Sequence, residues 1–205
     1  MKIFDSIAHF ISFIFSPLLI PTYCMAIALS ITYLYSVPTS TKWHAILTIF
    51  AITTAIPLIA IYILYRLKVV TDPGLNKQNE RIIPYIITFL CYLGAALYIF
   101  TIHGPHWLIA FILGGAVANV VNFGVNYKWK ISGHGAAMGG ALALIFYISY
   151  SGINVWPALP WLYGTLLATG LTGWARLFLK RHTLPQVMTG ILNGFTCVYI
   201  AMIIS

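Results

Sequence analysis

The chain has 205 residues, of which 60% are hydrophobic and only 7% are charged, and its mean hydropathy is +0.92. A soluble domain carries about 25% charged residues, so this composition excludes an ordinary soluble protein and indicates an integral membrane protein. The formal net charge is +8, from eleven Lys and Arg against three Asp and Glu. Because there is no soluble basic domain to hold nucleic acid, this charge fits cytoplasmic loops, anionic lipid headgroups or an anionic substrate.

Long apolar segments follow one another along the chain with short polar connections between them. A membrane-spanning helix needs about 20 mostly apolar residues, and every backbone group in lipid must be paired, so these segments predict helices. They lack the alternation of apolar and polar residues that the strands of a membrane barrel show. The predicted segments are residues 7–35, 43–65, 83–102, 107–123, 134–150, 161–179 and 184–204. We therefore expect an all-α membrane bundle of six to seven transmembrane helices, forming a single domain over residues 1–205.

The first apolar segment contains Ser16, Pro17 and Pro21. Since proline kinks or ends a helix, we expect either a kinked helix or an interfacial entry helix followed by a span. The total is six spans if this segment does not cross. Its apolar run is long and has no clear small-residue cleavage site, which favours a retained helix over a removed signal peptide.

The order of the spans predicts which polar loops lie together. In a bundle of antiparallel neighbours, the loops after the second, fourth and sixth spans share one face. These loops hold residues 77–81, 130–134 and 176–182, whereas the opposite loops hold little charge beyond Lys42. A cluster of basic side chains with two histidines is therefore expected on one face, whether the chain has seven spans or only the first segment fails to cross.

The side chains in this cluster suit phosphate chemistry. Arginine offers a bidentate fork and lysine a point charge, and the start of a helix favours an anion. The candidate phosphate ligands are Arg81, Arg176, Lys77, Lys128, Lys130, Ser132 and Gly133. Of two nearby histidines, His134 and His182, one could attack phosphorus while the other protonates the leaving oxygen. Positive groups would stabilise the equatorial oxygens of the transition state.

The spacing of these residues resembles the type 2 phosphatidic acid phosphatase superfamily, whose motifs are written KxxxxxxRP, PSGH and SRxxxxxHxxxD. Residues 131–134, Ile-Ser-Gly-His, match the second motif without its proline. Residues 175–186 match the third motif in the spacing of Arg176 and His182. The first motif is partial, because Arg81 lies three residues before Pro84 and Lys77 is the candidate for its lysine. The resemblance covers residues 66–200.

The resemblance implies that His182 is the nucleophile that forms a phosphohistidine and that His134 is the general acid for the lipid leaving group. It implies that the phosphate is held by Arg176, Arg81, Ser132, Gly133 and Lys77 or Lys130. Such phosphatases need no metal or other cofactor. Their membrane members act on lipid phosphates or diphosphates, such as polyprenyl diphosphate, phosphatidic acid, phosphatidylglycerophosphate or lipid A. Membrane lipids are the other expected partners; the sequence does not indicate an oligomeric state.

Gln186 stands where the third motif has Asp. A Gln carbonyl can fix the tautomer of a histidine but supplies no charge. In a serine-protease triad, loss of that carboxylate costs about 10⁴ in rate. Thr183 and Gln186 also fit a capping box at the start of the last helix, so both an orienting and a capping role stay open. The alternative function is a catalytically weak or inactive protein that binds or transports a lipid phosphate.

The remaining polar residues have plainer interpretations. His44, His103 and His106 fit interfacial anchoring at helix ends. Asn119, Asn122 and Asn126 share one helix face, where hydrogen bonding between helices is the default and lining of the site the alternative. Two small-residue pairs, Gly135 with Gly139 and Gly190 with Gly194, predict close helix packing. The three cysteines lie in apolar runs and predict neither a disulfide nor a zinc site.

The side of the membrane on which the cluster lies stays open. Ten of the eleven Lys and Arg fall on the face of the cluster, so the positive-inside rule predicts the cytoplasmic side. The resemblance implies a multi-pass protein of the inner membrane with its site toward the periplasm.

Overall fold

The computed structural model describes residues 2–72 and 79–205, and all regular elements in this part of the chain are helices. The helices are α1 (Lys2–Ile14), α2 (Ile20–Ile31), η1 (Tyr33–Ser36), α3 (Thr39–Phe50), η2 (Ala51–Ala55), α4 (Ile56–Arg66), η3 (Asn79–Arg81), α5 (Ile82–Thr101), α6 (His106–Asn126), α7 (Gly133–Tyr150), α8 (Leu159–Phe178) and α9 (Leu184–Ile203). The all-α prediction is confirmed for the described residues. Six of the seven predicted segments have ends within four residues of those observed.

Four helices in the described part are long and apolar enough to cross a membrane. They are Thr39–Arg66, which joins α3, η2 and α4, together with α5, α6 and α9. Helices α7 and α8 have 18 and 20 residues, which is long enough, but they are less apolar, and α1 and α2 are each too short. Large apolar side chains such as Leu97, Phe100 and Leu192 are exposed on the outside of the bundle, as lipid-facing residues are.

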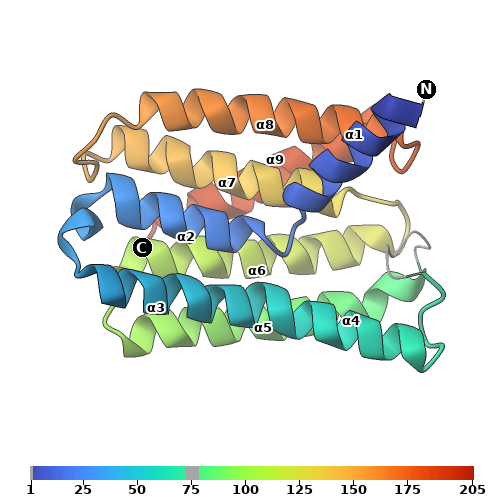
Figure 1. The fold of residues 1–205 in the computed structure, drawn as a ribbon, viewed down its shortest axis with the longest axis horizontal. Helices are drawn as coiled ribbons and strands as arrows, with labels where there is room; N and C mark the ends of the chain where they lie inside the picture. Colours follow the sequence, from blue (N-terminus) through green and yellow to red (C-terminus); the bar gives the residue numbers. More distant parts are fainter. Residues whose placement is uncertain (1, 73–78) are drawn as a thin grey trace.

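The helices lie side by side along one long axis (Figure 1), and the most extensive packing is between α7 and α9. Glycine makes this contact close. A methyl group on Gly194 would collide with the Ala136 carbonyl oxygen, and one on Gly139 would collide with the Ile191 carbonyl oxygen. The predicted small-residue packing motifs are thus confirmed, and they bring the start of α7 beside the start of α9.

The first apolar segment does not form one helix. Helix α1 ends at Ile14, and α2 begins at Ile20 after a break that contains Ser16 and Pro17. The hydroxyl of Thr54 donates to the carbonyl of Leu18 at 2.7 Å and fixes this break against η2, a turn of π-helix. Helix α1 then packs against α8 over one end of the bundle.

The polar loops separate to the two ends of the bundle as predicted. Figure 1 shows the N-terminus and the connections after α4, α6 and α8 at one end, which we call the basic end. The C-terminus and the connections after α2, α5 and α7 lie at the other. Both candidate histidines therefore belong to the same end of the molecule.

Candidate functional site

A cavity of about 610 Å³ runs from the basic end into the interior of the bundle. Its polar part is lined by Arg81, His134, Arg176 and His182. It continues between α5 and α6 to apolar residues such as Phe111. None of the described residues that line it is acidic. The cavity therefore combines a positive entrance with a mostly apolar interior, as a ligand with an anionic head and a lipid tail requires.

The four polar residues come from four separate elements. Arg81 precedes α5, His134 lies in the first turn of α7, Arg176 in the last turn of α8, and His182 in the connection to α9. Arg81 and Arg176 are each 9% exposed, and His182 is 7% exposed. Burial of positive groups is costly unless other charges or polar groups compensate, so this arrangement favours an anionic ligand.

Gln186 makes both contacts that the sequence left open. Its Oε1 lies 3.2 Å from Nδ1 of His182 and accepts a hydrogen bond of 3.1 Å from the backbone N–H of Thr183. The second contact belongs to the capping box of α9. An amide oxygen can only accept, so the proton of His182 is assigned to Nδ1 and Nε2 is left with a free electron pair.

His182 is held in its neutral form. Burial lowers the pKa of His182 to about 4, and the charges of Arg176, Arg81 and Lys130 act in the same direction. The hydrogen bond to Gln186 opposes this fall. At neutral pH the imidazole therefore carries no charge, which is the state that a nucleophile needs.

His134 contacts a part of the chain that the motifs do not include. Its Nε2 lies 3.0 Å from the backbone carbonyl oxygen of Ser12 in α1, so the proton is assigned to that nitrogen. The Ser12 hydroxyl also accepts a hydrogen bond of 3.4 Å from Nη1 of Arg176. Helix α1 thus covers the polar part of the cavity and contacts two of its four polar residues.

The other candidate phosphate ligands occupy different positions. Ser132 is fully buried, donates its N–H to the Gln186 carbonyl at 3.2 Å, and caps α7 through Gly135. Gly133 lines the cavity. Lys130 is half-buried, and burial and then the charge of Arg81 lower its pKa. The remaining two candidates are Lys128, which is exposed, and Lys77, which lies outside the described residues.

Arg81 is fixed in place by groups on two elements. Its Nη1 donates to the Ile131 carbonyl at 3.3 Å. Burial lowers the pKa of Arg81, whereas the hydroxyl of Tyr85 raises it. Because Ile131 precedes α7 and Tyr85 belongs to α5, Arg81 links these two helices at the entrance of the cavity. No three of the described His, Cys, Asp and Glu residues are grouped so that they could hold a metal ion.

The sequence interpretation missed the polar residues of α5 deeper in the cavity, whereas it left open that Asn119 and Asn122 of α6 line the site. Tyr85, Thr88 and Tyr92 lie on one face of α5 and line the cavity. Asn119 and Asn122 line it from α6. The signal on α5 was present, because three polar residues at helical spacing follow Arg81 in an otherwise apolar segment. For Ser12 no local signal exists, since its contact is with a residue far along the chain.

No model of a known protein family, no curated protein and no solved structure matches this chain. The interpretation of the site therefore depends on the chemistry of its own residues.

Proposed function

We propose that this protein is a membrane phosphatase that hydrolyses a lipid phosphate or diphosphate through a phosphohistidine, without a metal ion. The observation that carries the proposal is the convergence of His134, His182, Arg81 and Arg176 on one cavity with an apolar interior. The motif spacing of the type 2 phosphatidic acid phosphatases supports it as well, because the same four residues carry that resemblance.

In the proposed reaction, Nε2 of His182 attacks phosphorus and forms a P–N bond while the bond to the lipid oxygen breaks. His134 keeps its Nε2 proton on the Ser12 carbonyl and takes up a second proton at Nδ1, which the negative charge of the bound phosphate favours. It gives this second proton to the leaving oxygen, and the lipid leaves as an alcohol or, from a diphosphate, as a monophosphate. Water then attacks the phosphohistidine, His134 takes the proton, and inorganic phosphate is released. Arg81 and Arg176 stabilise the charge on the equatorial oxygens, with Gly133 and Lys130 beside them.

The proposal includes a membrane arrangement of six to seven crossings in a bacterial inner membrane. Helices α7 and α8 would cross in addition to the four apolar spans, because each is long enough and lies along the same long axis of the bundle. Much of α7 is buried, so lipid does not set its composition. The side of the membrane on which the cavity opens can be measured on intact cells. A cysteine introduced at residue 68 reacts with an impermeant reagent only if that residue lies on the outer side of the membrane.

A second candidate function is a lipid-phosphate binding or transport protein with little catalysis. The observation that favours it is the amide of Gln186, which orients His182 but supplies no negative charge to its imidazolium.

Phosphate release by the purified protein distinguishes the two functions. The assay uses phosphatidic acid, phosphatidylglycerophosphate, lipid A and a polyprenyl diphosphate in detergent, with a chelator present. We expect release that is lost in both His182→Ala and His134→Ala. The matched control is His106→Ala, which changes an exposed histidine at the other end of the bundle and should keep full activity. Binding without release would instead support the second function.

A further inference from the structure

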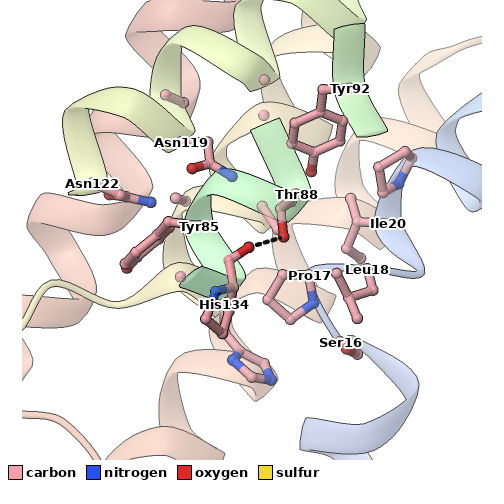
Figure 2. Close-up of a pocket in the computed structure, with 18 of the residues that line it drawn as sticks. Ser16, Pro17, Leu18, Ile20, Tyr85, Thr88, Tyr92, Asn119, Asn122 and His134 are labelled. Carbon is pink, nitrogen blue, oxygen red and sulfur yellow. Dashed lines mark hydrogen bonds between the residues drawn. The ribbon is translucent and has the colours of Figure 1, made fainter. Parts of the chain in front are cut away.

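The cavity is larger than a phosphate requires, and its middle part is polar. Below the charged entrance, hydrogen-bonding side chains face each other from α5 and α6. We call this group the linker subsite, and it consists of Tyr85, Thr88, Asn119 and Asn122. Figure 2 shows the two asparagines reaching from α6 toward the tyrosine and threonine of α5. Polar groups at this depth in a membrane bundle are costly, so they call for a ligand that can pair with them.

Asn119 carries the argument. It is only 8% exposed, lines the cavity, and has no hydrogen bond to any other described residue. A buried amide without partners is destabilising, so a partner must come from what fills the cavity. Asn122 differs, because its Oδ1 accepts a hydrogen bond of 3.0 Å from Asn193 on α9. That bond fixes the orientation of the Asn122 amide group in the cavity wall beside Asn119.

The depth of the subsite identifies the part of the ligand that it meets. Tyr85 and Thr88 follow Arg81 on α5 at about 6 and 10 Å along the helix axis. A phosphate held by Arg81 therefore places the next few atoms of the ligand at this level. The hydroxyl of Thr88 donates to the Pro84 carbonyl at 2.8 Å, which leaves the side-chain amides of Asn119 and Asn122 as donors toward the ligand.

We propose, on the basis of the proposed function, that the linker subsite binds the ester carbonyls of an acylglycerol phosphate. The amide N–H groups of Asn119 donate to a carbonyl oxygen, and the apolar end of the cavity takes the start of an acyl chain. A polyprenyl monophosphate carries no oxygen at this level and leaves the amide without a partner. The subsite thus selects an ester-linked glycerolipid over a lipid whose phosphate is followed by hydrocarbon alone.

Binding of matched lipid analogues tests the proposal without need of catalysis. The probes are phosphonates that cannot be hydrolysed, one with diacylglycerol and one with dialkylglycerol ether chains of equal length, together with a polyprenyl phosphonate. We expect the purified protein in detergent to bind the ester lipid about tenfold more tightly than the ether lipid, as one hydrogen bond of about 1.4 kcal/mol provides. Asn119→Leu, which has nearly the same shape, should reduce this preference to about one.

The controls separate a lost contact from a lost fold. Val120→Leu changes the exposed neighbour on α6 and should leave the preference unchanged. The Tm of Asn119→Leu should equal or exceed that of the wild type, because the substitution removes a buried amide that has no partner in the protein. Equal binding of ester and ether lipids by the wild type, or an unchanged preference in Asn119→Leu, would overturn the proposal. Absence of phosphate release from any lipid would count against the proposed function alone.

Discussion

The contact between His182 and Gln186 offers a sharp test of the proposed chemistry, because one substitution changes mainly its charge. Gln186→Glu keeps the length of the side chain, so an oxygen still lies near Nδ1 of His182 and still accepts the N–H of Thr183. A carboxylate at this distance favours the charged imidazole by about 1–3 pKa units. We expect the pKa of His182 to rise from about 4 into the range of about 5–7.

The same change should speed the reaction. Attack on phosphorus turns the imidazole of His182 into a positively charged phosphohistidine, which a carboxylate stabilises and an amide does not. The loss of about 10⁴ in a serine-protease triad sets the upper limit. We expect Gln186→Glu to raise kcat by about tenfold to a hundredfold, and Gln186→Leu to lower it by at least about tenfold because neither tautomer is then preferred.

The assay is phosphate release from one lipid over a range of pH for the wild type and both variants. Titration of the substrate affects all three equally, so a difference between their acid limbs reports the pKa of the enzyme. Thr183→Ala is the control for the helix cap, because it weakens the start of α9 but leaves the oxygen of Gln186 beside His182. If Gln186→Glu changes neither the acid limb of the pH profile nor kcat, the proposed role of residue 186 in the chemistry of His182 is wrong.

Three further predictions concern the other parts of the site and the bundle. Arg176→Lys should lower kcat/KM by about tenfold or more through loss of the bidentate fork, whereas Arg181→Lys, outside the cavity, should not. Gly194→Ala should lower the Tm because its methyl group meets a backbone carbonyl of α7, whereas Gly164→Ala, with open space around it, should raise it. The pKa of His182 in the folded protein lies below its ordinary value of 6.5, so the unfolded chain binds a proton at a higher pH than the folded chain. The Tm should therefore fall as the pH drops from about 6.5 to 4. His182→Gln should make the Tm depend less on pH in this range.

The sequence could predict those parts of the site that depend on local patterns and on the order of the helices. The ends of the helices follow from where apolar runs meet polar loops, and the order of the helices then places the loops after α4, α6 and α8 together. The close approach of α7 and α9 follows from their glycines. Since these steps need only local patterns and chain order, His134 and His182 could be assigned to one site before their positions were known.

The number of membrane crossings could not be predicted in the same way. Hydropathy measures how well a segment suits a lipid environment. A helix in the middle of a bundle contacts other helices more than lipid, so its hydropathy can be low although it crosses the membrane. Helix α7 has many buried small residues, Gly and Ala above all, which suit close packing and lower its hydropathy. The first apolar segment is the opposite case, because its hydropathy is high but the break at Pro17 divides it into two short helices.

The part of the chain before residue 66 also shapes the site and the cavity. The motif resemblance begins at that residue, yet Ser12 contacts His134, and Ser16, Pro17 and Leu18 form one wall of the cavity (Figure 2). No pattern in the sequence indicates these contacts, because they join segments more than a hundred residues apart and depend on how α1 folds back over α8. Two chains with identical motifs but different N-terminal helices would therefore share the chemistry at phosphorus and differ in the lipid that they admit.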